Sequence, residues 1–430
     1  MGFGRQEALA EITTKRALAI SVNRLRKADL ERLIKQYETR DHAATETLCR
    51  QLLAQHPDSF AASRILGSVL HEQGKLTEAI QTYRRVIQLE PDYVQAYVDL
   101  SSALIEARLP AQAIAVCKQV LTRQPNSIQA HDDWCVALQQ MGLHRDALGV
   151  AEAAVAIDAS SAQAPHSKAS ALSHLGRHTQ AIAYFNRAIE LDPNDARAYN
   201  GRGYALLSSN RRFAALADLK RAALLGYNRA VTLNNIGLVY EELGQLDEAE
   251  AYLRQAIDNT PALNQASSNL LLTLNYNPHR SIDTCLAEAR AFNQRVTQRI
   301  DQALFTRAYA GLAGPSISAR SAERLRIGFV SGDLRNHPVG YFLESILSAM
   351  SLEQFDLAAF PTTPTRDELT QRIQPNFSIW QPIAHLNDYD AARLIRQHSV
   401  DILIDLSGHT AYNRLAMFVL KPAPIQISWL

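Results

Sequence analysis

Prolines recur along the first two thirds of this chain at intervals of 34 residues or multiples of it. Proline lacks a backbone N–H and clashes with the preceding turn, so each one marks the end of a helical segment. Positions at this spacing form a 34-residue grid, and two of them, Ala159 and Tyr227, have no proline but also follow a helical run. A repeat of this period constrains the fold more than any other feature. The prolines on the grid are Pro57, Pro91, Pro125, Pro193 and Pro261.

Three further columns repeat with the prolines. Ten residues after each grid point the side chains are small or modest, which allows two helices to approach closely: Gly67, Ser101, Cys135, Ala169, Gly203 and Gly237. Seventeen residues after, most copies hold a residue that accepts a positive φ in a tight turn: Gly74, Gly142, Gly176, Asn210 and Gly244. Twenty-two residues after, every copy holds alanine: Ala79, Ala113, Ala147, Ala181, Ala215 and Ala249. The sequence therefore predicts consecutive pairs of helices.

These columns resemble the tetratricopeptide repeat. Six complete copies span residues 60–263, a degenerate copy precedes them at 26–59, and a partial copy follows at 264–275. The resemblance implies an α-solenoid over residues 26–275, preceded by an N-terminal helix or tail at 1–25. The first helices of such a stack line a concave groove that binds extended protein or peptide segments.

Amide side chains gather in the predicted groove of the later repeats. One column contains Asn200, Asn234 and Ser268, and the next contains Asn235 and Asn269. An amide carries both donors and acceptors, so it is suited to hydrogen-bond the backbone of a peptide whatever its side chains. The alternative interpretation is that these are solvated polar positions. We also expect that the repeats serve as the contact of a homodimer.

Charge and composition exclude several classes of partner. Lys plus Arg number 44 and Asp plus Glu 43, which gives a formal charge of +1 and argues against nucleic acid or a membrane as partner. The sequence contains neither an apolar run long enough to span a bilayer nor a secretory signal, so we expect a cytoplasmic location. The four cysteines form no CxxC pair, so they predict neither a zinc site nor a disulfide framework.

Residues 276–323 are expected to connect the repeats to a different fold. A single helix from Ser281, which can cap it, to about Phe305 is followed by a stretch rich in Gly, Ser and Ala, which indicates a loop.

In residues 324–430 strands alternate with helices, which predicts an α/β, Rossmann-like parallel sheet. We expect Asp388 to cap one of its helices, over 388–399. The expected strands are 325–330, 355–362, 377–383, 401–407 and the segment PIQISWL at the end of the chain, and the other expected helices are YFLESILSAM, a short one before the third strand, and RLAMFVL. Loops that leave the carboxyl ends of such strands build the site. The two loops that stand out are 331–340 and 407–413.

Two blocks of this last segment, RLRIGFVSGDLRNHPVGYFLESIL at 324–347 and DILIDLSGHTAYNRLAMFVLKPAPIQISWL at 401–430, carry a second resemblance. They are similar to the start of the catalytic region of bacterial protein O-linked N-acetylglucosamine transferases, glycosyltransferase family 41. The order of repeats, linking helix and this segment is also that of the family. The resemblance implies transfer of N-acetylglucosamine (GlcNAc) from UDP-GlcNAc to Ser or Thr of proteins, with no metal or other cofactor.

The resemblance also supplies candidate site residues. His337 and Pro338 match the family's His-Pro loop at the catalytic cleft, and Asp333 is a carboxylate in the same loop, for which a capping role is the alternative. Gly408, His409 and Thr410 match the second cleft loop. A histidine near pKa 6.5 is suited to orient a donor or to manage a proton, so we assign His337 and His409 as cleft residues without choosing between these roles.

The family's catalytic region has two Rossmann-like halves, and the second supplies most contacts to the donor. The given sequence stops at Leu430, within the first half. We therefore expect a fragment or a truncated product that lacks transferase activity as a 430-residue chain. Two alternatives stay open: a non-catalytic scaffold that binds proteins through its repeats, and a separate chain that supplies the second half.

Overall fold

The computed structural model describes residues 25–300, 305–306, 324–351 and 353–429. The predicted tail at 1–25 and the predicted loop of the linker therefore fall almost entirely outside the described residues. The chain divides into two compact units, one of residues 1–140 with 145–167 and the other of residues 141–144 with 168–430. Among the described residues, no helix is both long and apolar enough to cross a membrane.

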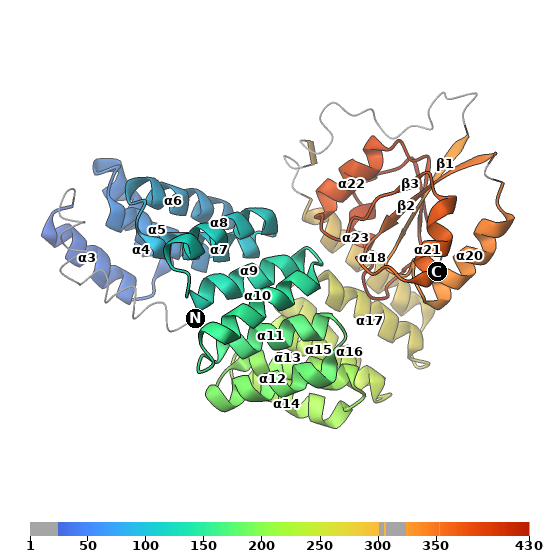
Figure 1. Cartoon of the computed structure of the whole chain (residues 1–430), viewed down its shortest axis with the longest axis horizontal. Helices are drawn as coiled ribbons and strands as arrows, with labels where there is room; N and C mark the ends of the chain where they lie inside the picture. Colours follow the sequence, from blue (N-terminus) through green and yellow to red (C-terminus); the bar gives the residue numbers. More distant parts are fainter. Residues whose placement is uncertain (1–24, 301–304, 307–323, 352, 430) are drawn as a thin grey trace. The chain divides into compact units, whose positions relative to one another are not determined.

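Paired helices follow one another through the repeat region (Figure 1). Those that lie mainly in the first unit are α3 (Lys27–Glu38), α4 (His42–Gln55), α5 (Phe60–Glu72), α6 (Leu76–Leu89), α7 (Val94–Glu106), α8 (Pro110–Arg123), α9 (Ile128–Gln140) and α10 (His144–Ile157). The helix α11 (Gln163–His174) lies at the division. The helices of the second unit are α12 (His178–Leu191), α13 (Ala196–Ser208), α14 (Arg212–Leu224), α15 (Arg229–Glu242), α16 (Leu246–Asn259), α17 (Asn264–Tyr276) and α18 (Ile282–Gln298). These elements confirm the predicted α-solenoid.

The turns within the pairs explain the column of Gly and Asn. All five predicted turn residues have a positive φ, for example 62° at Asn210 and 74° at Gly244. The copy that lacks such a residue has Arg108 at the equivalent position, and its φ is 58°. The turn geometry is therefore common to the repeats, and two copies adopt it with a side chain that disfavours it, since Arg40 of the degenerate copy has a φ of 60°.

The helix that leaves the repeats is shorter than predicted. Ser281 caps α18 as expected, because its side chain accepts a hydrogen bond from the N–H of Thr284. The helix ends at Gln298, well before Phe305. Buried Glu288 pairs with Arg254 of α16 at 2.8 Å and with Arg295 at 2.7 Å, which fixes α18 against the last repeats.

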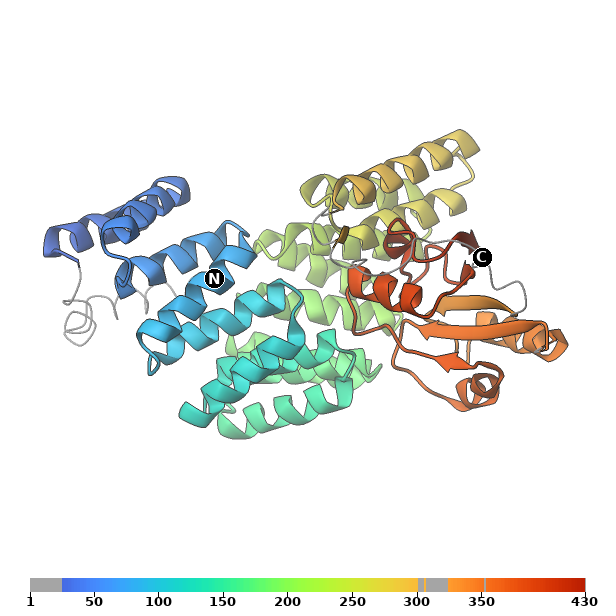
Figure 2. The same cartoon turned by 90° about the horizontal axis from the view of Figure 1, so that it is seen from above.

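The C-terminal segment forms one parallel sheet of five strands (Figure 2). Its strands are β1 (Leu325–Ser331), β2 (Phe355–Pro361), β3 (Ile379–Trp380), β4 (Ile402–Asp405) and β5 (Ile425–Ser428), in the order β3-β2-β1-β4-β5. Its helices are α20 (Pro338–Ala349), α21 (Glu368–Ile373), α22 (Asp388–Gln397) and α23 (Leu415–Phe418), with a short 3₁₀ turn at Gln374–Asn376. The predicted parallel α/β sheet is confirmed.

Helices cover both faces of this sheet. Leu343 and Leu347 of α20 and Ile373 of α21 pack on one face. Ile395 of α22 and Met417 of α23 pack on the other, with Phe360 of β2. Since both faces are covered, the central strands β1 and β2 are buried over most of their length.

Some boundaries differ from the sequence-based expectation. The prediction that Asp388 caps α22 was wrong: Asn387 is the cap, its side chain accepts from the N–H of Asp390, and Asp388 instead pairs with Arg414 at 2.9 Å. The third strand is only two residues long, and α23 covers only four residues of the predicted helix RLAMFVL. Short apolar runs of this kind fit strand, helix or loop equally well, so tertiary packing decides their extent.

Candidate active site

The two predicted loops lie side by side at the carboxyl ends of β1 and β4. These strands are neighbours in the sheet, and the order of strands reverses between them, which makes this point the switch point of the sheet. Ser331 Oγ at the end of β1 lies 3.2 Å from Ser407 Oγ after β4, and the N–H of Gly332 donates to Ser407 Oγ at 3.3 Å. The sheet therefore brings together residues that are far apart in sequence.

The first loop presents His337 at the start of α20. His337 is the N-cap of this helix, and its Nδ1 accepts a hydrogen bond from the N–H of Val339 at 3.3 Å. Pro338 occupies the first helical turn, where its missing N–H costs nothing. The carboxylate of Asp333 is buried, 3.8 Å from His337 Nδ1 and 3.3 Å from Arg335 Nη2. An Nδ1 that accepts is unprotonated, so neutral His337 carries its proton on Nε2.

The second loop is held by the buried carboxylate of Asp405. Its oxygens accept from the N–H of Ser407 at 3.2 Å and of Gly408 at 2.9 Å, and from Ser428 Oγ at 3.0 Å. Burial raises the pKa of Asp405, and these hydrogen bonds oppose that rise. Thr410 is exposed and its hydroxyl donates to Ser407 O at 2.7 Å. Asp405 therefore shapes the turn that presents His409.

A third loop, after β2, also reaches the switch point, and the sequence analysis missed it. Thr362 Oγ1 donates to the carbonyl of Tyr412 at 2.7 Å, and Thr363 Oγ1 donates to the carbonyl of Gly332 at 3.1 Å. Gly332 is required here, because a Cβ on it would lie 2.7 Å from Cβ of Tyr412. The signal that was available is the Thr-Thr pair directly after a predicted strand.

His409 contacts the last repeat. Its Nδ1 lies 3.3 Å from Oγ of Ser268 in α17, and its ring meets the edge of Phe292 of α18 with 5.9 Å between centroids. Burial lowers the pKa of His409. Ser268 was predicted as a groove residue and His409 as a cleft residue, and the structure places the two side chains in contact.

An apolar core surrounds this contact. Leu271 of α17 and Phe292 and Val296 of α18 pack together with Leu415 of α23 and with Val419, which follows that helix. The loop that carries His409 is therefore held against the repeats by buried side chains as well as by hydrogen bonds.

The predicted groove amides form a continuous hydrogen-bonded row. Gln265 donates to Asn269 at 3.0 Å, Asn269 to Asn234 at 2.8 Å, Asn234 to Asn235 at 3.3 Å, and Asn235 to Asn200 at 3.2 Å. Asn234, Asn235 and Asn269 are 5–8% exposed, so they are not the solvated positions of the alternative interpretation. Gln265 was missed, although it precedes Asn269 by one helical turn.

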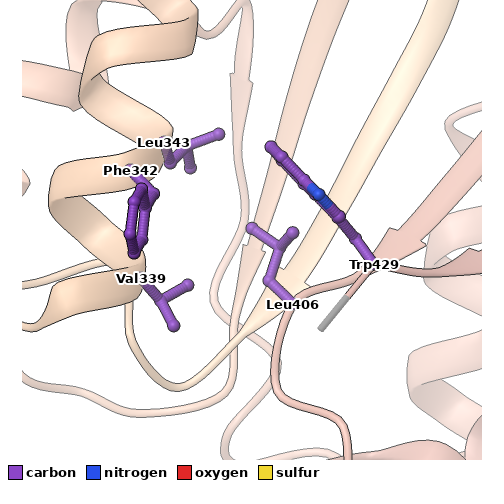
Figure 3. A pocket seen from close by; sticks show the side chains of 5 residues that line it. All are labelled: Val339, Phe342, Leu343, Leu406 and Trp429. Carbon is purple, nitrogen blue, oxygen red and sulfur yellow. The ribbon is translucent and has the colours of Figure 1, made fainter.

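An apolar cavity of about 210 Å³ opens beside the two histidine loops (Figure 3). Val339, Phe342 and Leu343 of α20 face Leu406 and Trp429 across it. None of these five side chains is charged, so the cavity suits an apolar group better than a phosphate.

A second cavity of about 160 Å³ lies where α17 meets the loop before α23. It is polar, and its lining includes Gln265, Ser268, Asn413 and Arg414. It therefore continues the row of amides toward His409. Within the part of the chain that the structure describes, no group of three or more His, Cys, Asp or Glu side chains is placed to hold a metal ion.

Comparison with protein families agrees with both resemblances. Residues 295–430 match the family described as glycosyl transferase family 41. Tetratricopeptide repeat models match residues 36–93, 70–132, 169–209 and 230–263. The chain therefore carries matches to tetratricopeptide repeats, followed by a segment that is similar to that glycosyltransferase family.

Curated relatives are similar over part of their length. A protein of Oryza sativa subsp. japonica named probable UDP-N-acetylglucosamine--peptide N-acetylglucosaminyltransferase SPINDLY is 30% identical over 174 residues, which are 40% of this chain and 18% of that protein. An Arabidopsis thaliana relative with the same enzyme name, called SEC, is 32% identical over 109 residues, 25% of this chain and 11% of its own. The chain thus matches about a fifth of the length of the SPINDLY relative and about a tenth of the length of SEC.

Two solved structures show the fold. A mutant O-GlcNAc transferase of Thermobaculum terrenum matches with a TM-score of 0.53 and 28% identity, over 64% of this chain and 51% of that one. A tetratricopeptide repeat protein of Parabacteroides merdae matches with a TM-score of 0.50 and 18% identity, over 57% of this chain and 99% of its own.

Proposed function

We propose that this chain supplies the protein-binding repeats and the first sheet of the catalytic region of a protein O-GlcNAc transferase of glycosyl transferase family 41. The observation that carries the proposal is the contact between Ser268 of the last repeat and His409 of the cleft loop. A protein held by the repeats is thereby presented to the loops at the switch point of the sheet. The names of the relatives and of the T. terrenum structure support the same reaction.

The proposed reaction moves GlcNAc from UDP-GlcNAc to a Ser or Thr hydroxyl. The hydroxyl oxygen bonds to the anomeric carbon, the bond from that carbon to the β-phosphate oxygen breaks, UDP leaves with the bonding electrons, and the hydroxyl proton passes to a base. Donors near the leaving diphosphate stabilise the charge that develops there. The reaction as proposed uses no metal.

The row of amides is proposed to bind the acceptor as an extended segment. Each amide offers two N–H groups and two lone pairs, and the row uses only some of them. For Asn234, the bonds to Asn235 and Asn269 leave one N–H and one lone pair. Backbone contacts of this kind explain how one groove accepts proteins of different sequence.

A homodimer through the repeats is the second proposed contact. Phe213 and Leu224, on α14, are 78% and 82% exposed. Large apolar side chains exposed to this degree on one helix are typical of an interaction surface.

For the 430-residue chain by itself we propose peptide binding without transfer. The cavity beside the histidine loops is lined by apolar side chains, so it offers a diphosphate neither a cation nor a hydrogen-bond donor apart from the indole N–H of Trp429. The non-catalytic scaffold is the alternative, since it needs only the repeats.

A transfer assay tests the proposal. The protein purified from its own cells is incubated with radiolabelled UDP-GlcNAc and host-cell protein, and UDP-glucose serves as the donor control. We expect label on Ser and Thr with UDP-GlcNAc and none with UDP-glucose. Absence of label with the native protein, despite binding of the same host proteins, would establish the scaffold instead.

A further inference from the structure

Three elements fix the imidazole ring of His409. Ser268 Oγ of α17 lies 3.3 Å from its Nδ1, Phe292 of α18 packs against its face at an interplanar angle of 74°, and Asn413 of its own loop contacts the same serine. Ser268 is 1% exposed, so its hydroxyl is largely shielded from bulk solvent. The tautomer of the imidazole therefore depends on which atom accepts the proton of this hydroxyl.

Asn413 determines the direction of these hydrogen bonds. Its Nδ2 donates to the carbonyl of Thr410 at 2.8 Å, and its Oδ1 accepts from the N–H of Leu415 at 3.4 Å, so the orientation of the amide is set by the backbone. The same Nδ2 lies 3.4 Å from Ser268 Oγ and can only donate to it. Among the hydrogen bonds of the described residues, the one acceptor left for the Ser268 proton is Nδ1 of His409.

We propose that Ser268 is a positioning residue that holds neutral His409 with its proton on Nε2, so that the ring offers substrate a hydrogen-bond donor and not a base. This inference rests on the proposed function and names the atom that acts. The group it serves is an anionic oxygen of the leaving diphosphate, to which a neutral N–H donates without first losing a proton.

Burial favours the same state. It lowers the pKa of His409, so the neutral ring prevails at neutral pH, and no charged neighbour contributes to that shift. On α18, Glu288 and Arg295 pair with each other at 2.7 Å.

His337 reaches the same tautomer by another route. Its Nδ1 accepts the N–H of Val339 at the start of α20. Both cleft histidines therefore use Nδ1 for the fold and present Nε2–H. The base that takes the acceptor proton is a different group.

The contact also gives the repeats a direct influence on the cleft. Ser268 occupies the column of Asn200 and Asn234, and its neighbour Asn269 belongs to the hydrogen-bonded row. The hydroxyl that is proposed to set the tautomer therefore lies one residue from the row that is proposed to bind the acceptor.

Nitrogen NMR of the 430-residue chain tests the inference without any substrate. The protein is labelled with ¹⁵N in its 13 histidine rings, and His409 is assigned by the signal lost in His409→Gln. Spectra are recorded at about pH 8, above the ordinary histidine pKa. Long-range correlations from ring protons distinguish a protonated nitrogen from a bare one.

The matched variants are two adjacent serines. Ser268→Ala removes the hydroxyl that faces His409, and Ser267→Ala removes one that is equally buried, at 1% exposure, but contacts Arg295. We expect Nε2–H in the wild-type protein, a mixture of both tautomers in Ser268→Ala, and the wild-type pattern in Ser267→Ala. Circular dichroism establishes that each variant is folded.

Two results would overturn the inference. One is a protonated Nδ1 in the wild-type spectrum, which is decisive even if a variant fails to fold. The other is a wild-type tautomer that persists in folded Ser268→Ala. The proposed function is tested separately. The expected spectrum combined with no GlcNAc transfer by the native protein would contradict the proposed reaction but not the role of Ser268. GlcNAc transfer combined with the opposite tautomer would contradict only the role of Ser268.

Discussion

Asn269 of the last repeat donates from Nδ2 to Oδ1 of Asn234, one repeat earlier, over 2.8 Å. Both side chains are buried, so the bond ties the two repeats together at the proposed peptide groove. The same pair of residues therefore contributes to the stability of the repeats and to the proposed binding of peptide, and substitution of either residue tests both contributions.

Replacing Asn234 with Ala should weaken both properties. The change leaves Nδ2 of Asn269 and Oδ1 of Asn235 without their bond to Asn234 in a buried setting, which costs about 1–3 kcal/mol of unfolding free energy. It also removes a proposed contact to the acceptor backbone. Urea unfolding and peptide binding by fluorescence anisotropy measure the two effects. Asn194→Ala, at an exposed position, serves as control, and equal binding by both variants would exclude the groove.

Two glycines in helices should respond in opposite ways to alanine. At Gly237 a Cβ would lie 2.8 Å from Cγ of Leu253, so overpacking of about 1–3 kcal/mol outweighs the helix propensity gained. At Gly149 a Cβ would meet no atom within 4 Å, so Gly149→Ala should stabilise by up to about 1 kcal/mol. Thermal unfolding of both variants checks the sign. A stabilised Gly237→Ala would mean that the helices approach less closely than described.

Asp133 should make the repeats less stable as pH rises. Burial raises its pKa from 3.8 to about 6, assisted by the charge of Asp132 and opposed by the hydroxyl of Ser101. The folded state therefore binds more protons than the unfolded state between these values, so the stabilising contribution is present below about pH 4 and is lost as pH passes through about 6.

The size of this effect follows from the shift. A difference of about two units corresponds to about 3 kcal/mol, lost once the carboxyl ionises in the folded protein. Asp133→Asn should remove this pH dependence between about 4 and 6, whereas Asp92→Asn, at an exposed position, should retain it. Urea titrations at several pH values give the free energy of unfolding as a function of pH. If this free energy changed with pH in parallel for the wild type and Asp133→Asn, Asp133 would not be the titrating group.

Polar substitution of the exposed apolar pair on α14 should reduce self-association. Phe213→Ser combined with Leu224→Ser removes two side chains that the folded chain leaves largely in water. Analytical ultracentrifugation is expected to show a dimer for the wild type and a monomer for the double variant. Leu143→Ser, at another exposed apolar position, is the control. A monomeric wild type would refute the dimer.

The sequence predicted the repeats well because their physics is local. The proline, the positive-φ turn residue and the invariant alanine each lie within a single pair of helices, and each returns in the following pairs. Arg108 shows where this reasoning stops, because it adopts a φ of 58° that its own side chain disfavours. The prediction of the α22 cap was wrong for a similar reason. Asn387 and Asp388 are both residue types that cap helices well, and in the structure Asp388 pairs with Arg414 while Asn387 caps the helix.

The candidate site was predicted in parts and not as a whole. Family resemblance supplied His337 and His409, and the repeat columns supplied Asn234 and Ser268. No local pattern relates Ser268 to His409, because 141 residues separate them and only the packing of α17, α18 and α23 brings them together. The same holds for Thr362, which reaches the site through the order of strands in the sheet.

The most direct test of the account is to compare Ser and Thr modification in host cells with and without this protein. Host proteins are digested and mapped by mass spectrometry with a fragmentation method that retains sugars. The account predicts N-acetylhexosamine on Ser and Thr of a set of proteins in wild-type cells, its loss when the gene is deleted, and its return with the wild-type gene but not with His409→Gln. Identical modification in wild-type and deleted cells, or complete return with the variant, would contradict it.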